Sequence, residues 1–457
     1  MKLLPINKRV FLKTSPYIFI FLNAVIYALI YFFRSRVGAF GSIEKYLPNE
    51  PLFGTLLLIT LIWLYYWGHK NIDIFSFRLI LSGYILFAVI LLATPVLLSD
   101  DIYAYAMKGR VYAIYDQNPY LVPAINFPHD DFIKYIGSSW HVLFPQTYGP
   151  LWNTISILLS WLGKNSPYLA IFLFKLIGFI ANSLILFLVY KIGQIFNPVK
   201  LKEIFFLYAW SPFLLLEFIN NAHNDAWLVL FTILAFYFYF TKKDGLIIPS
   251  LVLAGLIKYI SWLLIPLFII FLYKEKRLTT NLIFVSIILS LIFLVGFYLP
   301  FFAGITTFFG LLNQVGLNRP AVHYNPLLLL SYLIFGASFL SQKISLQYSL
   351  GLCLLLERIV YAFAYLKSIF SNKNIIDITI VIFILFAFLA SATVLPWYIT
   401  WWLPFLILKN QTRAVIFWSL VGMCAYFLFE SVSLSLFIVG GTFWLAEKFW
   451  RQNLQIN

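Results

Sequence analysis

A series of long apolar segments joined by short polar links constrains this chain more than any other feature. Of its 457 residues, 62% are hydrophobic and 11% are charged, whereas soluble domains carry roughly 25% charged residues. Because a membrane-spanning helix takes about 20 apolar residues, the hydrophobic residues would fill about fourteen such helices. We therefore expect an all-α integral membrane protein, a polytopic bundle of about 12–14 transmembrane helices in one domain over residues 1–457.

The distribution of basic residues predicts the orientation of these segments. The chain has 32 Lys and Arg against 17 Asp and Glu, an excess that indicates topology and anionic lipid rather than nucleic-acid binding. Placing basic links such as 191–202 in the cytoplasm puts both termini inside and the polar segment 99–150 outside, provided that 151–163 and 326–340 do not cross. We expect a multi-pass cell membrane protein whose external loop 99–150 carries short helices. The stronger apolar segments lie near 17–33, 52–67, 79–98, 167–190, 203–219, 226–240, 245–257, 260–273, 279–300, 348–366, 375–395, 398–408, 414–429 and 432–447.

Acidic side chains open the long polar segment. Asp100 and Asp101 are adjacent, and Tyr103, Tyr105 and Arg110 follow within the next ten residues. Two neighbouring carboxylates suit a general base, because like-charge proximity and partial burial raise the pKa of one of them. An isolated acidic pair also fits a solvated helix end.

Further polar residues are expected on the same external face. His223, Asn224 and Asp225 would line a site or cap the helix that follows them. Lys258 lies between two apolar half-segments and would hold an anionic group such as a phosphate, or extend to the interface. The remaining candidates would bind phosphate or stack on a sugar, or belong to ordinary loops and interfacial aromatic belts: Arg319, His323, Trp140, His141, Tyr148, Trp397 and Tyr398.

Little other chemistry is indicated by the embedded residues. Only Glu217 among the other buried charges is expected near this site, and Cys353 and Cys424 lie inside apolar runs. Metal-ligand spacings, a phosphate-binding loop and a dinucleotide fingerprint are missing from the sequence. We expect no required cofactor, and the need for a divalent cation stays open.

These residue types suit sugar transfer from a lipid carrier. A carboxylate accepts the proton of an acceptor hydroxyl, which attacks the anomeric carbon through an oxocarbenium-like state. A polyprenyl phosphate leaves as a stable anion, so one base and cations on the phosphate suffice. The partners expected are a polyprenyl-phosphate sugar donor, a glycan or glycolipid acceptor, and membrane lipids.

The ordered motifs also resemble a known family, the polyprenyl-phosphate-mannose-dependent mannosyltransferases of the GT-C superfamily, in their bacterial and archaeal multi-spanning branch. The motifs are SDDIYAY at 99–105, GRV at 109–111, NPY at 118–120, AHNDA at 222–226, LAGLIK at 253–258 and LPWY at 395–398. The resemblance spans roughly residues 99–400. It implies a GT-C-like bundle and an inverting transfer of a hexose, mannose in this family, on the outer face.

The resemblance also implies roles for individual residues. Asp101 matches the family's Asp-x-Tyr pattern and would be the base, with Asp100 as its partner or substitute. His223, Asn224 and Asp225 would shape the sugar pocket. The lipid phosphate would be bound by Lys258 and Arg319. The family often has an aromatic-acidic pair where this chain has Met107 and Lys108, which leaves the sugar and acceptor preference open.

Two other functions fit the same composition. A transporter or flippase of lipid-linked sugars predicts charges near the bilayer midplane and paired repeats with broken helices. A polysaccharide polymerase or ligase with a lipid-pyrophosphate donor would depend on Arg and His residues of outer loops. The acidic motif at one predicted helix end favours the glycosyltransferase.

Overall fold

The architecture is helical throughout the part of the chain that the structure describes. The computed structural model describes residues 8–35, 50–136, 139–308, 358–371, 373–390 and 395–428. In these ranges the only β-type pairing is one isolated bridge between Ala303 and Ile305. The expected all-α fold class is confirmed.

Within the described residues, most of the expected apolar segments form helices, whereas 432–447 and the first part of 348–366 lie outside the described residues. The third expected segment, 79–98, is the main exception, because its helix ends at Ala93 and Thr94 is already extended, as expected of a residue before Pro95. The longer helices are α1 (Lys8–Ser35), α2 (Glu50–Lys70), α3 (Phe77–Ala93), α4 (Asp101–Ala113), α6 (Pro150–Leu162), α7 (Pro167–Phe196), α8 (Leu201–Ala209), α10 (Asp225–Phe240), α11 (Ile247–Gly255), α12 (Leu264–Lys274), α13 (Thr280–Tyr298), α18 (Ile375–Leu385) and α20 (Thr412–Leu428).

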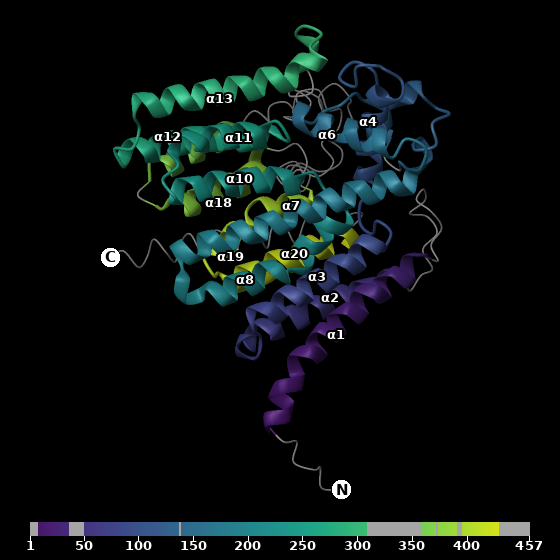
Figure 1. The fold of residues 1–457 in the computed structure, drawn as a ribbon, viewed down its shortest axis with the longest axis vertical. Helices are drawn as coiled ribbons and strands as arrows, with labels where there is room; N and C mark the ends of the chain where they lie inside the picture. The colour runs from purple at the N-terminus through teal and green to yellow at the C-terminus, as the bar shows by residue number, and fades with distance from the viewer. Residues whose placement is uncertain are drawn as a thin grey trace, which may run out of the picture.

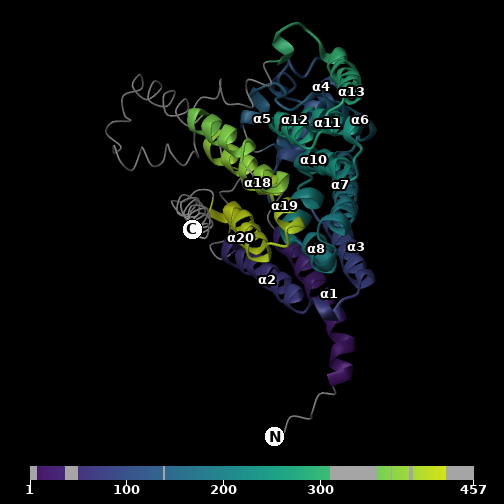
Figure 2. The same ribbon diagram turned by 90° about the vertical axis from the view of Figure 1, so that its left-hand side faces the viewer.

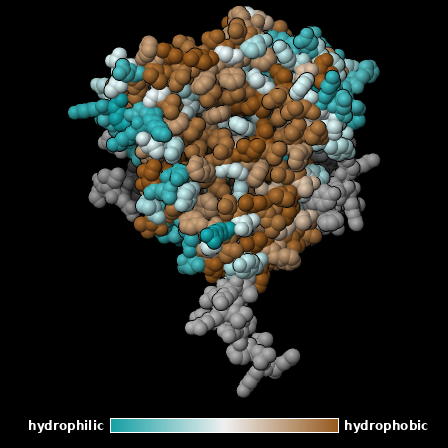
Figure 3. All heavy atoms as spheres, in the orientation of Figure 1, coloured by the Kyte–Doolittle hydropathy of each residue, from teal (hydrophilic) through white to brown (hydrophobic). Residues whose placement is uncertain are grey.

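The axes of most of these helices are roughly aligned with one another (Figure 1). Apolar residues cover the middle of the face in Figure 3, and hydrophilic residues gather at its left and right edges, where the helices of Figure 1 end. Among the described residues, two helices are long and apolar enough to cross a membrane, Pro167–Phe196 and Thr280–Phe301, or three with the bent pair of Pro198–Ala209 and Pro212–Asn220. Several shorter apolar helices accompany them. The chain is thus a membrane protein, and a total of 12–14 crossings stays a prediction.

Neighbouring helices of the bundle form two layers. In one layer α7 packs against α3, α8 and α10, and α11 lies between α10 and α13. Helices α18, α19 (Leu403–Leu408) and α20 lie on one side of that layer in Figure 2. There α18 contacts α12, α19 contacts α7 and α8, and α20 contacts α2.

Helices α4 and α6 lie together at one end of the bundle (Figure 1). They can pack closely because Gly109 has no side chain: a Cβ there would lie 2.3 Å from the carbonyl oxygen of Ser156. Neither α4 nor α6 is among the candidate membrane spans of the described residues. That 151–163 does not cross the membrane stays a prediction, and 326–340 falls outside the described residues.

Several helices are broken where they approach α4. The π-helical turn η6 (Leu216–Asn220) follows α9 (Pro212–Leu215) and ends the bent pair that begins with α8, whose two parts are bent by 46°. Helix α11 stops at Gly255, and the 3-10 turn η8 (Tyr259–Leu263) follows an extended Lys258. A further 3-10 turn, η12 (Pro396–Trp401), precedes α19. These irregular turns deliver the polar side chains described below.

Candidate active site

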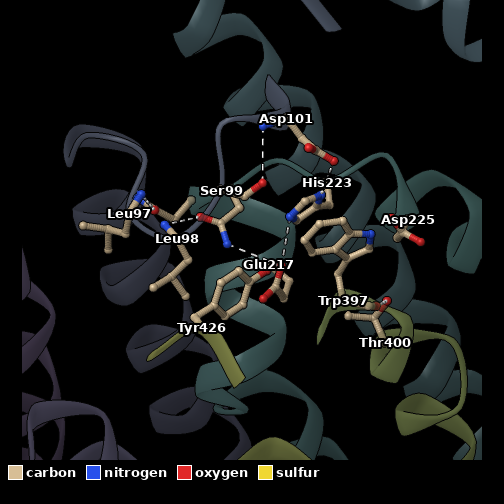
Figure 4. Close-up of polar contacts among 12 residues, drawn as sticks. Leu97, Leu98, Ser99, Asp101, Glu217, His223, Asp225, Trp397, Thr400 and Tyr426 are labelled. Atoms are coloured by element: carbon tan, nitrogen blue, oxygen red, sulfur yellow. Dashed lines mark hydrogen bonds and ion pairs between the residues drawn. The ribbon is translucent and has the colours of Figure 1, made fainter. Parts of the chain in front are cut away.

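The link between α3 and α4 is held in place by two asparagines that end the η6 turn. The Asn220 amide accepts a hydrogen bond from the Leu97 N–H at 2.8 Å and donates to the Pro95 carbonyl at 2.8 Å. The Leu98 N–H donates to Asn221 Oδ1 at 3.1 Å (Figure 4). An irregular, buried backbone needs such partners. The motif around residue 220 therefore fixes the segment that leads to Asp100 and Asp101.

Asp101 begins α4 and is buried among side chains that can exchange protons. Its Oδ1 lies 2.9 Å from His141 Nε2, and its Oδ2 accepts a hydrogen bond from the Tyr105 hydroxyl at 3.2 Å. His223 Nδ1 lies 3.6 Å from the same Oδ2. Tyr105 reaches this carboxylate because positions four apart share a helix face.

The pKa of Asp101 depends mainly on groups outside the acidic pair. Burial does disfavour the charged form, but His141, His223 and Lys258 outweigh it and hold the pKa of Asp101 below its ordinary value. The neighbours that dominate come from other segments of the chain, not from the adjacent Asp100. The carboxylate is ionised at neutral pH and available to accept a proton.

His223 lies deeper and connects Asp101 with Glu217. The imidazole is fully buried and Trp397 stacks on it, with ring centroids 4.3 Å apart (Figure 4). Its Nε2 lies 3.3 Å from Glu217 Oε2. Ala222 enters this loop with φ of 50°, a left-handed conformation that is costly for alanine. Burial lowers the pKa of His223, so the ring is neutral at pH 7.

Asp225 and Lys258 form a separate ion pair beside this cluster. Lys258 Nζ lies 3.0 Å from both carboxylate oxygens of Asp225, and Trp401 Nε1 donates to one of them. The ammonium also faces the rings of Tyr148, Tyr398 and Trp401 at 5.4–5.6 Å from their centroids. Asp225 is therefore fully partnered, and the Lys258 charge is largely compensated.

Tyr148 approaches Lys258 through a close backbone contact. The Gly149 N–H donates to the Ile257 carbonyl at 3.0 Å. A Cβ on Gly149 would lie 2.1 Å from the Leu256 carbonyl oxygen, so a larger residue cannot fit there. Tyr148 also meets Tyr105 edge to face, with centroids 5.4 Å apart. The Tyr-Gly-Pro motif thus links the Lys258 pair to α4.

Asn224 is the N-cap residue of α10, yet its side chain makes no capping hydrogen bond. Both polar atoms of its amide are buried without a hydrogen-bond partner in the described structure. Since buried amides are nearly always satisfied, this side chain is suited to bind a ligand hydroxyl. The alternative role of Asn224 as a side-chain cap is excluded by this geometry.

Some of the expected site residues make their contacts elsewhere or lie outside the described residues. Arg110 is at the other end of α4, where Nε pairs with Asp130 at 2.8 Å and Nη1 donates to the Lys164 carbonyl at 2.7 Å. Tyr103 faces away from Asp101 and stacks on Tyr135, with centroids 5.3 Å apart. Arg110 and Tyr103 thus contact Asp130 and Tyr135, and their role in substrate binding stays a prediction. Asp100 is the half-buried N-cap of α4 and stays a candidate. Arg319 and His323 lie outside the described residues.

Several members of the cluster could not be assigned from sequence patterns. His141 was expected to stack on a sugar, and its contact with Asp101 depends on the short helix α5 (Ser139–Leu143). Trp401 had a weak signal, the aromatic run at 397–402. Tyr426 had none, because it lies in an ordinary apolar helix. No three His, Cys, Asp or Glu side chains of the described residues could hold a metal ion.

A comparison with known families gives one match. Residues 50–274 match the model of the alpha-(1->6)-mannopyranosyltransferase family, N-terminal domain. This stretch is similar to the N-terminal domain of that mannosyltransferase family. It includes Asp101, His141, His223, Asp225 and Lys258, and it supports mannosyl transfer and hence a membrane glycosyltransferase. A comparison with proteins of curated function gives no match for this chain.

Proposed function

We propose that this mannosyltransferase moves mannose from a polyprenyl-phosphate donor to a glycan or glycolipid acceptor at the outer face of the membrane. One observation carries the proposal: Asp101, the loop that contains His223, and the Asp225–Lys258 pair meet in one buried cluster although they are far apart in the sequence. A lipid-linked donor reaches such a site from the bilayer.

In this proposal Asp101 is the general base. Its carboxylate takes the proton of the acceptor hydroxyl while the new bond forms at the anomeric carbon, on the face opposite the leaving phosphate. The configuration at that carbon is therefore inverted. The phosphate leaves with the electron pair of the broken bond and needs no proton.

The donor would be held by groups on either side of Asp101. Asn224, whose buried amide lacks a partner in the described residues, would bind a sugar hydroxyl, together with His223. Lys258 has a third N–H beyond the two that face Asp225, and would direct it to the phosphate. Tyr148 and Tyr398, which flank the ammonium, would pack on the sugar.

A panel of labelled donors tests this function. Purified wild-type protein would receive polyprenyl phosphates that carry mannose, glucose or arabinose, with a membrane lipid extract as the acceptor source. We expect label to leave the mannose carrier and the product to have inverted configuration. Donor binding would be measured in the same samples. If no donor binds, the proposal fails and a flippase or transporter becomes the better interpretation; transfer from a lipid pyrophosphate alone would indicate a polymerase or ligase.

A further inference from the structure

The Asn-Pro-Tyr motif at 118–120 stands out in the sequence, and the proposed reaction gives it no role. It lies in the loop that follows α4. Tyr120 is buried, and its hydroxyl donates a hydrogen bond to the Tyr148 carbonyl at 2.9 Å. The Pro119 carbonyl accepts from the Gln146 N–H at 2.7 Å. Two hydrogen bonds therefore join the motif to the segment that carries Tyr148.

The motif is also anchored to the end of α13. Asn118 Nδ2 donates to the Phe301 carbonyl at 2.9 Å, and Asn118 Oδ1 accepts from the Tyr120 N–H at 3.0 Å. The Tyr120 ring meets the Phe301 ring edge to face, with centroids 5.7 Å apart. This phenylalanine belongs to η9 (Leu299–Phe301), the turn that follows α13. Asparagine suits the position, because its amide donates and accepts at the same time. The motif thus bridges α13 and the segment of Tyr148.

The backbone at 145–149 forms neither helix nor strand. Its polar groups depend on partners elsewhere, since an irregular backbone cannot satisfy them internally. Gln146 Oε1 accepts from the next two backbone N–H groups, at 3.1 and 3.4 Å. The Tyr148 carbonyl receives the Tyr120 hydroxyl. Because side chains and not secondary structure hold this backbone, the loss of one of these hydrogen bonds allows it to move.

The course of this backbone decides where the Tyr148 ring lies. The ring centroid is 5.5 Å from Lys258 Nζ, and the ring meets Tyr105 edge to face. The next residue, Gly149, is bonded to the carbonyl of Ile257, which directly precedes Lys258. In sites where reacting groups must be aligned, a displacement of about 1 Å is enough to affect function. A shift of Tyr148 would therefore change its position relative to a donor held at Lys258.

We propose that Asn118, Pro119 and Tyr120 form a positioning motif that fixes the Tyr148 ring beside Lys258 and so contributes to the selection of the donor sugar. Sugars that are epimers differ in which hydroxyl groups face a neighbouring ring, so the position of that ring affects their relative kcat/KM values. The inference rests on the proposed function, because it takes Tyr148 and Lys258 as parts of the donor site.

The environment of Tyr148 can be measured without any substrate. Full-length protein in detergent would carry 3-fluorotyrosine at position 148, and its 19F NMR signal would be compared among wild type, Tyr120→Phe and Asn118→Ala. We expect a shifted or broadened signal in both variants, since each loses hydrogen bonds of the motif. If one variant does not fold, the other decides.

The matched control is Tyr115→Phe, which removes a hydroxyl of the same loop that donates to Asp130 at 2.8 Å. That hydrogen bond has a charged acceptor, so its loss costs at least as much stability. The control should leave the 19F signal of the label at position 148 unchanged. An unchanged signal in a folded motif variant, or an equal change in the control, overturns the proposal.

Kinetics with mannose and glucose carriers test the selection of the sugar. Tyr120→Phe should raise the KM for the mannose donor about fivefold, as expected for one lost hydrogen bond, with an unchanged turnover number. The ratio of kcat/KM for mannose over glucose should fall by a similar factor. An unchanged ratio, or the same changes in Tyr115→Phe, would limit the motif to a structural role. A wild-type protein that binds no donor would refute the proposed function, whereas the 19F comparison would still decide whether the motif positions Tyr148.

Discussion

Two buried acids of this site, Asp101 and Asp225, have opposite surroundings. Asp225 is bound by a lysine through both oxygens and by an indole N–H. Asp101 faces His141, His223 and Tyr105, each of which can gain or lose a proton or turn its hydroxyl. The difference separates a carboxylate that fixes structure from one that can change its protonation during a reaction.

The comparison also explains why charge alone does not mark a reactive group. Asp225 is the more deeply buried of the two and has the stronger ion pair. A strongly held cationic partner stabilises the ionised form of a carboxylate and therefore disfavours the uptake of a proton. Asp101 is ionised as well, yet its partners can be replaced by a substrate hydroxyl without leaving a fixed charge unpaired.

The largest effect on stability should come from breaking the Asp225–Lys258 ion pair. Lys258→Met leaves Asp225 charged and buried, so it should lower the free energy of unfolding by about 3–5 kcal/mol. The double variant Asp225→Asn with Lys258→Met removes both charges and should recover most of this stability in thermal unfolding in detergent.

Donor binding by that double variant then tests the phosphate role. If Lys258 binds the donor phosphate, the double variant should bind polyprenyl-phosphate mannose at least about tenfold more weakly than the wild type does. This is the effect expected for the loss of a charged hydrogen bond. Unchanged donor affinity would restrict Lys258 to stabilising the fold.

Changes around Asp101 should instead alter the pH dependence of activity. His141 is the largest influence that lowers the pKa of Asp101 against the effect of burial. His141→Gln therefore raises that pKa, and the acid limb of the kcat/KM profile moves to higher pH, with about tenfold lower activity per pH unit below it. The depressed pKa also contributes stability above the ordinary aspartate pKa of about 4, which is lost as the pH falls toward the folded-state value. An acid limb that does not move would show that His141 does not act on Asp101.

Arg110 provides a contrast at the other end of α4. Arg110→Lys loses the paired geometry with Asp130 and the contact with the Lys164 carbonyl, so stability should fall by about 1.5–3 kcal/mol. The KM for the donor should not change. A raised KM with unaltered thermal stability would instead return Arg110 to the substrate site.

The smallest effect is expected at Ala222. Its positive φ suits glycine better than alanine, so Ala222→Gly should relieve strain of about 1 kcal/mol. Thermal unfolding would show a slightly higher melting temperature. A clear loss of stability would mean that the alanine methyl group contributes packing worth more than the strain.

Much of the fold was predictable because apolar length is a local property. The apolar segments at 226–240 and 279–300 correspond closely to α10 and α13. The juxtaposition of Asp101, His223 and Lys258 was also foreseen, since motifs at the ends of helices on one face tend to meet.

The pairing partners within the site were not predictable. That Lys258 binds Asp225, and that His141 rather than Asp100 controls Asp101, depends on long-range packing that no local pattern encodes. Arg110 belongs to the same group of sequence motifs as Asp101, and we therefore expected it at the same site. Its guanidinium instead meets Asp130, a residue with no sequence signal of its own.

The most direct test of the account is a single turnover by Asp101→Asn with labelled polyprenyl-phosphate mannose already bound. The variant should bind the donor as the wild type does, and the label should stay on the lipid, with a rate at least about 10³-fold lower. Transfer at a rate within about tenfold of wild type, in Asp101→Asn and in the double variant with Asp100→Asn, would contradict the assignment of Asp101 as the base.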